Sequence, residues 1–144
     1  MENFSNRDLI VEVVNRLFVY TDAQAWDKLQ LEVFSENVLF DMTSLGGETL
    51  NTTSKNICAI WKNGFAGIDA VNHLAGNYLV EIDKDSAKVF AYATATHYKK
   101  SATQGTTREF TGTYDLALAR TASGWRIHQF KYNLKYTRGN LNLV

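Results

Sequence analysis

The chain has 144 residues, of which 45% are hydrophobic, so it is long enough to bury a core and too apolar to remain disordered. Its 15 lysines and arginines balance 15 aspartates and glutamates, so no net charge favours binding to nucleic acid or to an anionic membrane. We therefore expect one domain over residues 1–144, with no nucleic-acid partner and no membrane partner.

The first residues contain no basic stretch followed by an apolar run and a cleavage site, so we expect no secretory signal. No apolar run approaches the roughly 18 residues that a membrane-spanning helix requires. The chain has one cysteine, Cys58, which cannot form an internal disulfide and so fits a reducing compartment. These features predict a cytoplasmic protein.

The first half of the chain has the periodicity of helices. Apolar residues between Leu9 and Phe18 recur at spacings of three and four, which predicts an amphipathic helix. Ser5 can cap this helix, which we expect to end near Ala23. A second helix is predicted over residues 26–34, with Leu29 and Leu31 near its core side.

The segment between the two halves is less regular. A short strand is predicted over residues 38–42, followed by a loop rich in Gly, Thr and Asn over residues 43–53. A short helix is then predicted over residues 54–65.

The second half of the chain alternates between apolar and polar residues, as strands do. Four long strands are predicted over residues 71–82, 88–98, 109–120 and 125–136, and the short polar turns between them predict a mostly antiparallel sheet. Long strands twist and coil, which creates a concave face, and Gly112 inside a strand predicts a bulge or a bend.

Helices that precede an antiparallel sheet give an α+β fold, with the helices packed on one face of the sheet. Small helices cannot fill a strongly curved sheet completely, so we expect a pocket between the two layers.

Three side chains in this layout are candidates for acid–base chemistry. Asp22 lies four residues after Phe18 on the apolar face of the first helix, where a carboxylate needs a partner; alternatively, it caps the helix that follows. His73 opens the first long strand and is either a satisfied core histidine or the partner of a carboxylate. His97 shares one strand face with Ala93, where small side chains indicate either close helix packing or room for a ligand.

The sequence contains no spacing typical of a metal site, no phosphate-binding loop and no serine nucleophile motif, so we expect neither a metal nor a cofactor. Tyrosines such as Tyr114 and Tyr132 are possible hydrogen-bond donors, although such residues are more often structural.

Three segments resemble the SnoaL-like members of the nuclear transport factor 2-like superfamily, in an order that spans nearly the whole chain. Residues 20–42 resemble the family's opening, residues 71–83 its histidine-containing strand, and residues 110–131 its two closing strands with the Gly-Trp-x-Ile signature. The matching residues of the opening are Asp22, Trp26, Asp27, Leu29, Phe34, Val38, Phe40 and Asp41.

The resemblance implies a cone-shaped α+β barrel, usually a homodimer through the outer face of the sheet. Among family members, scytalone dehydratase and hexachlorocyclohexane dehydrochlorinase use an Asp–His dyad to remove a proton without a cofactor. That dyad carries over to His73 as the base and Asp22 as its partner, with His97 or a tyrosine as a possible acid. The expected pocket residues are Phe18, Trp26, Phe40, Met42, Trp61, Ala93, Tyr114, Phe130 and Tyr132.

The chain also departs from the dehydratase pattern. Ala93 stands where the family has a second histidine, Met42 replaces a tyrosine, and Tyr114 lies near the position of a polar pocket residue. The resemblance therefore leaves two functions open. The first is a dehydratase, isomerase or cyclase acting on a small apolar substrate. The second is a ligand-binding or dimeric interaction domain without turnover.

Overall fold

The computed structural model describes residues 3–144. Its helices are α1 (Asn6–Asp22), α2 (Trp26–Lys28) and α3 (Ser54–Gly64), with a π-helical turn η1 (Leu29–Val33) and a 3-10 turn η2 (Thr43–Leu45). Its strands are β1 (Phe34–Asp41), β2 (Thr49–Thr53), β3 (Ala70–Asp83), β4 (Ser86–Tyr98), β5 (Thr107–Thr121) and β6 (Gly124–Gly139).

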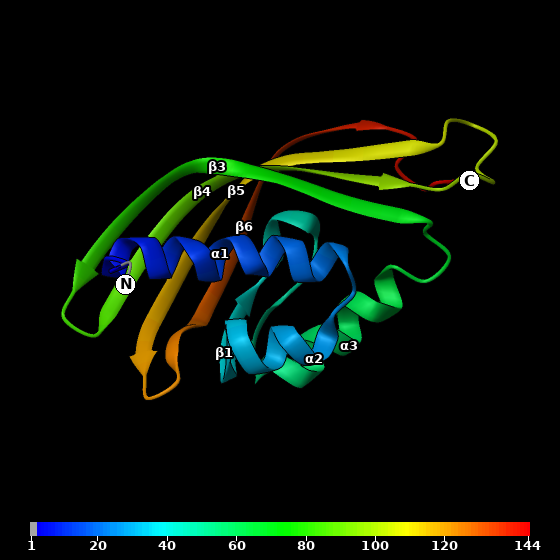
Figure 1. Cartoon of the computed structure of the whole chain (residues 1–144). Coiled ribbons are helices and arrows are strands. Elements are labelled where there is room, and N and C mark those ends of the chain that lie inside the picture. The colour runs from blue at the N-terminus through cyan, green and yellow to red at the C-terminus, as the bar shows by residue number, and fades with distance from the viewer. Residues whose placement is uncertain (1–2) are drawn as a thin grey trace.

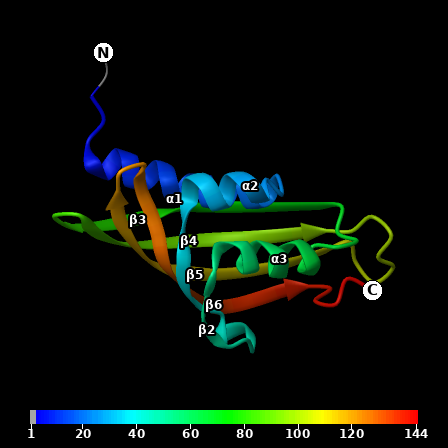
Figure 2. The same ribbon diagram turned by 90° about the horizontal axis from the view of Figure 1, so that it is seen from below.

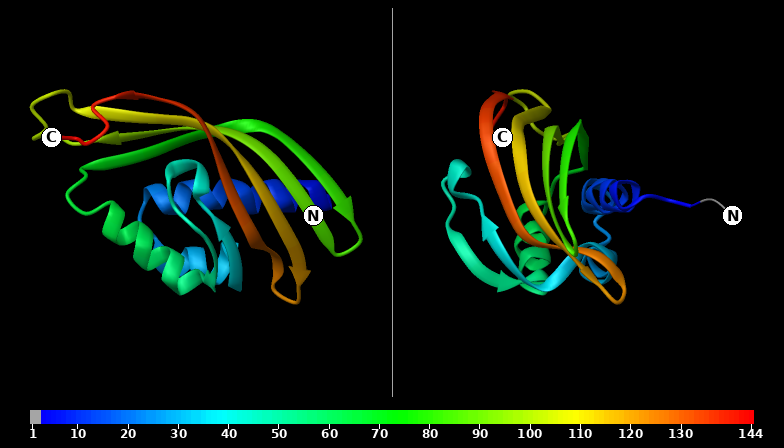
Figure 3. Two further views of the ribbon diagram at one scale, coloured as in Figure 1. Left: turned by 180° about the vertical axis from the view of Figure 1, so that it is seen from behind. Right: turned by 90° about the vertical axis from the view of Figure 1, so that its left-hand side faces the viewer.

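The six strands form one curved, unclosed sheet in the order β2-β1-β6-β5-β4-β3. Neighbouring strands are antiparallel except β1 and β6, which run parallel. The sheet bends strongly along its length, and the helices lie within the bend (Figures 1 and 3). The predicted α+β fold, with a mostly antiparallel sheet and helices on its concave face, is confirmed.

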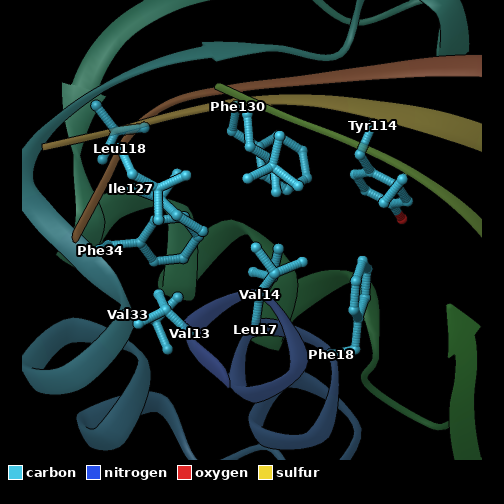
Figure 4. Packing of buried hydrophobic residues seen from close by; sticks show 14 of the residues in the cluster. Val13, Val14, Leu17, Phe18, Val33, Phe34, Tyr114, Leu118, Ile127 and Phe130 are labelled. Atoms are coloured by element: carbon cyan, nitrogen blue, oxygen red, sulfur yellow. The ribbon is translucent and has the colours of Figure 1, made fainter. Parts of the chain in front are cut away.

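Helix α1 runs along the concave side of the sheet next to β3, and α3 packs against β1 and β2 (Figure 2). Ser5 and Asp8 form a complete capping box at the start of α1, and the sequence predicted Ser5 as this cap. Val14 and Leu17 point from α1 toward the sheet, and Phe18 points toward Tyr114 (Figure 4). The predicted apolar face of this helix therefore packs against the strands.

The second predicted helix is present over residues 26–33, but its type was predicted wrong beyond its first turn. Only Trp26–Lys28 is α-helical, and the chain then widens into the π-helical turn η1. Leu29 is fully buried, whereas Leu31 is 74% exposed, so the prediction that both leucines face the core is also wrong. Residues two positions apart point to different sides of a helix, and Val33, four positions after Leu29, takes the second core place.

The predicted loop over residues 43–53 contains strand β2, which the sequence analysis missed. Its five residues, TLNTT, are polar on both faces and form an exposed edge of the sheet, so they lack the apolar alternation that indicates a strand. Strand β1 also begins four residues earlier than predicted and ends at Asp41.

A bulge in β6 changes which of its residues face the core. His128 has no cross-strand partner, because Ala117 pairs with Gln129 and Leu118 pairs with Ile127. Beyond this bulge Phe130 turns inward although Arg126 faces outward, so simple alternation does not hold along β6.

The bulge predicted at Gly112 is present, since the pairing of β5 with β6 shifts between Thr111 and Gly112. A Cβ atom at Gly112 would lie 2.4 Å from the Asn133 carbonyl oxygen and 2.5 Å from the Tyr132 hydroxyl oxygen. Glycine is thus required by space, because β6 passes too close for any side chain.

We predict that Gly112→Ala destabilises the protein by about 1–3 kcal/mol, as overpacked core positions do. Chemical denaturation measures this loss. Gly76→Ala is the matched control, since Gly76 also lies inside a strand but a Cβ atom there would meet no atom within 4 Å. Equal stability of the two variants would contradict the close approach at Gly112.

Within residues 3–144, no helix has both the length and the apolar character needed to cross a membrane. The Cys58 thiol is free and buried, and burial raises its pKa to about 11, so it is not a reactive nucleophile. The cytoplasmic location stays a prediction.

Candidate active site

A cavity of about 160 Å³ lies between α1 and the concave face of the sheet. Its wall is mostly apolar and aromatic, and it comprises Leu17, Phe18, Thr21, Met42, Leu45, Trp61, Phe65, His73, Ala95, His97, Phe110, Tyr114, Phe130 and Tyr132. The Thr21 hydroxyl donates to the Leu17 carbonyl at 2.6 Å, so it is already engaged within α1. The polar groups left for a ligand belong to the two histidines and to Tyr114, because the Tyr132 hydroxyl is enclosed by protein.

Asp22 and His73 form a short contact between two titratable side chains at the cavity. Asp22 is the last residue of α1, and its Oδ1 lies 2.6 Å from Nδ1 of His73 on β3. The second carboxylate oxygen, Oδ2, accepts the backbone N–H of His73 at 2.9 Å. The two contacts hold both the imidazole ring and the strand that carries it.

This arrangement assigns the protons of the His73 ring. Ionised Asp22 accepts hydrogen bonds only, so Nδ1 of His73 carries the proton and donates it to the carboxylate. The other ring nitrogen, Nε2, then keeps a free lone pair. The His73 side chain is 10% exposed and its ring packs 5.5 Å from Phe18, so this basic nitrogen lies in apolar surroundings.

His97 lies on the neighbouring strand and is also buried. Its ring packs between Phe65 and Phe110, and its Nδ1 accepts a hydrogen bond from Nε of Arg108 at 2.9 Å. Burial, and to a lesser extent the charge of Arg108, lowers the pKa of His97 to about 4. His97 is therefore neutral near pH 7.

Two tyrosines complete the polar groups. Burial raises the pKa of Tyr132 to about 12 and that of Tyr114 further, so both hydroxyls keep their protons. The Tyr132 hydroxyl is buried without a hydrogen-bond partner among residues 3–144. A buried hydroxyl in this state is costly unless a ligand or a water molecule satisfies it.

The structure brings most of the sequence-predicted pocket residues to the cavity wall, namely Phe18, Met42, Trp61, Tyr114, Phe130 and Tyr132 together with His73 and His97. Asp22 stands behind His73 and is not part of the wall.

Three predicted pocket residues lie outside the wall. Phe40 packs against both Trp61 and Phe130, and Trp26 stacks on Phe65 at 6.2 Å, so both support wall residues from behind. Ala93 is buried two positions before Ala95, and Ala95 takes the place in the wall that Ala93 was expected to occupy.

The sequence analysis missed several wall residues. Ala95 and Phe110 could have been found, since Ala95 shares the strand face of His97 and pairs directly with Phe110. Phe65 and Leu45 gave no comparable signal, because each follows a regular element and its direction depends on how the chain turns there.

No group of three or more His, Cys, Asp or Glu side chains among the described residues could hold a metal ion.

The model of the SnoaL-like domain matches residues 2–131, which is nearly the whole chain. The chain belongs to the SnoaL-like family. The resemblance seen in the sequence is thereby confirmed, and the fold agrees with that of solved nuclear transport factor 2-like proteins.

Three solved structures illustrate how far this SnoaL-like fold extends. A Kribbella flavida protein is 25% identical, with a TM-score of 0.89 over 96% of this chain and 95% of that one. A proposed scytalone dehydratase from Novosphingobium aromaticivorans is 12% identical, with a TM-score of 0.77 over 92% and 85%. A proposed dehydratase of the NTF2-like family from Streptomyces avermitilis is 10% identical, with a TM-score of 0.77 over 91% and 97%. No curated protein matches the chain.

Proposed function

We propose that this SnoaL-like protein is a cofactor-free enzyme that removes a proton from a small, largely apolar molecule. The observation that carries the proposal is the 2.6 Å contact between Asp22 and His73 beside an apolar cavity that His73 lines. An oriented imidazole with a free lone pair can act as a general base. The apolar wall of the cavity strengthens the electrostatic interaction between this imidazole and Asp22.

In the proposed reaction, Nε2 of His73 takes a proton from a substrate carbon. The imidazolium that forms keeps its contact with the Asp22 carboxylate, which stabilises the new positive charge. In an elimination, the C–H electron pair forms a C=C bond and the leaving group on the adjacent carbon departs with its bonding pair; a leaving hydroxide can take the proton from His73 and leave as water. In an isomerisation the proton returns from His73 to another carbon, and in a ring closure the electron pair bonds to an electrophilic carbon of the same substrate. A positioned base of this kind contributes about 10²–10⁴-fold to the rate.

Elimination is the first choice among these reactions, which would make the protein a dehydratase-like lyase. Two proteins of the same fold are described as proposed dehydratases, one of them for scytalone. The cavity, near the size of an engineered 150 Å³ cavity that binds benzene, would take a molecule with one or two rings.

A second candidate function is binding without turnover. The observation that favours it is the small volume of the cavity, into whose wall the bulky side chains of Met42 and Phe130 are packed. Such a domain would hold an apolar ligand and leave it unchanged.

Nitrobenzisoxazole separates the two functions. It is a small planar molecule that opens when a base removes the C–H proton of its isoxazole ring and the N–O bond breaks, releasing a coloured phenolate. We expect saturable turnover at least about 10²-fold faster than free imidazole at equal concentration. The NMR signals of the Trp61 indole and the Met42 methyl group report binding. Binding without turnover would contradict the enzyme and support the binding domain, and no binding would contradict both.

We also propose that the protein is a homodimer through the outer face of the sheet. Leu74, Leu79 and Tyr92 are exposed on this face, and Phe90 packs against Tyr92 at 5.4 Å. Lysines and acidic residues surround a hollow there, including Lys88 and Asp115, so a copy related by two-fold symmetry would bring opposite charges together.

We predict that Phe90→Glu converts the dimer into a monomer, because a charged carboxylate would replace an apolar ring in the buried part of the interface. Sedimentation velocity measures the mass in solution. Leu31→Glu is the control, since Leu31 is 74% exposed in the η1 turn and away from this face. A wild-type monomer, or a dimer that survives Phe90→Glu, would contradict the proposed interface.

A further inference from the structure

In each of the two cavity histidines, Nδ1 contacts a charged side chain, and the two side chains have opposite charges. His73 faces the Asp22 carboxylate, and His97 faces the Arg108 guanidinium. On the β3–β4 ladder His73 pairs with Ala95, two positions before His97, so both rings project from the same face of the sheet.

Arg108 is itself held in place. It is the direct cross-strand partner of His97 on β5, and its Nη1 donates to the Leu141 carbonyl at 2.9 Å. Two residues later Leu143 is buried, so the carboxyl-terminal segment packs behind the guanidinium. Arg108 is thus aimed at His97 by the sheet on one side and by this segment on the other.

The guanidinium fixes where His97 carries its proton. An arginine offers only N–H donors, so Nδ1 of His97 must accept and must be unprotonated. The proton of the neutral ring then lies on Nε2, which forms no hydrogen bond with any residue among 3–144. Besides burial, three charged or titratable side chains influence the pKa of this ring: Arg108 and His73 lower it, and Asp22, which lies behind His73, raises it. The neutral form is the stable one, because burial and Arg108 both disfavour a second positive charge.

We propose that His97 is the hydrogen-bond donor for the oxygen that becomes negative when His73 removes a proton, and that Arg108 is the positioning residue that fixes this role. The proposal rests on the proposed function and adds the second half of its machinery. Nε2 of His73 accepts a proton, whereas Nε2 of His97 donates a hydrogen bond.

The donor set also indicates the substrate class. Besides His97, the cavity presents the Tyr114 hydroxyl, which keeps its proton, whereas the Tyr132 hydroxyl is enclosed by protein. Such a wall suits a compact apolar ring that bears an acceptor oxygen, as in a ketone. When the C–H bond next to the carbonyl breaks, its electron pair forms the C=C bond. The carbonyl π pair moves to the oxygen, whose charge the donors then stabilise.

The nitrogen NMR spectrum of the unliganded, labelled protein tests the proton positions without any turnover. We expect His97 to carry its proton on Nε2 near pH 7 and to remain neutral until the pH falls toward about 4. In Arg108→Met the proton should distribute over both ring nitrogens, and the titration midpoint should rise. Arg126→Met is the control, because its guanidinium bonds backbone carbonyls such as that of Leu31. A wild-type His97 that is cationic near pH 7 or protonated on Nδ1 would overturn the proposal.

Binding of indanone and indane, measured by NMR titration, tests the donor itself. The two molecules share a ring system and differ in one carbonyl oxygen. We expect the wild type to bind indanone about tenfold more tightly than indane, the size of one good hydrogen bond. His97→Phe should lose this preference and still bind indane, whereas His97→Gln, which keeps an N–H donor, should recover part of it.

An unchanged preference in His97→Phe would overturn the role of His97 and leave the proposed function of His73 standing. Conversely, a protein without turnover would contradict the proposed function but would leave the proton positions and the indanone preference intact. The two proposals therefore fail separately.

Discussion

Replacing His73 by alanine is expected to lower the turnover of nitrobenzisoxazole by at least about 10²-fold. Among the described residues of the cavity wall, His73 alone has a ring nitrogen with a lone pair that no hydrogen bond occupies, and the variant lacks it. The melting temperature should change little. His73 lies on the edge strand β3, and Asp22 can still accept the backbone N–H of residue 73 in the variant.

Enzyme assays and thermal unfolding of the same preparations check both parts of this expectation. His128→Ala is the control, since His128 lies at a bulge of β6 and is not part of the cavity wall. A large loss of stability in His73→Ala would mark His73 as structural. An unchanged rate would exclude it as the base.

The second large effect concerns Asp22→Asn, which preserves size but changes the proton pattern. The backbone N–H of residue 73 can only donate, so the amide oxygen of the new asparagine should face it. The amide NH₂ group then faces Nδ1 of His73 and donates to it. The ring must carry its proton on Nε2, the position that has to be free for catalysis.

We expect Asp22→Asn to lower the rate by about 10²–10⁴-fold, with little loss of stability. Asp22→Ala should be less damaging, because without a partner the ring samples both proton positions. Asp27→Asn, at an exposed position five residues later, is the control. If Asp22→Ala were slower than Asp22→Asn, the carboxylate would act in some way other than by fixing the proton on Nδ1.

The fold was predictable because its strongest signals are local. The spacing of Val14, Leu17 and Phe18 fixes the buried face of α1, and the alternation of the second half fixes the four long strands. Strand β2 escaped because an exposed, threonine-rich edge strand has no apolar face to reveal it. The π-helical turn was missed because residues 29–33 give no local signal that separates it from an α-helix.

The candidate dyad was also accessible to sequence reasoning, since Asp22 lies on an apolar helix face and the resemblance supplied His73 as its partner. Arg108 was not. Its role depends on the direct pairing of β4 with β5 and on a carboxyl-terminal segment that folds back against it. The sequence could also not show that Trp26 and Phe40 lie behind the wall, because their positions depend on the packing of the aromatic cluster around Trp61.

The most direct test of the central claim is a crystal structure of the protein with bound indanone. We predict that the ring lies in the cavity between α1 and the sheet, with the carbon next to its carbonyl group about 3–3.5 Å from Nε2 of His73. Asp22 should remain bonded to Nδ1 of the same ring. A structure in which Asp22 and His73 are separated, or in which the ligand lies elsewhere on the protein, would contradict the account.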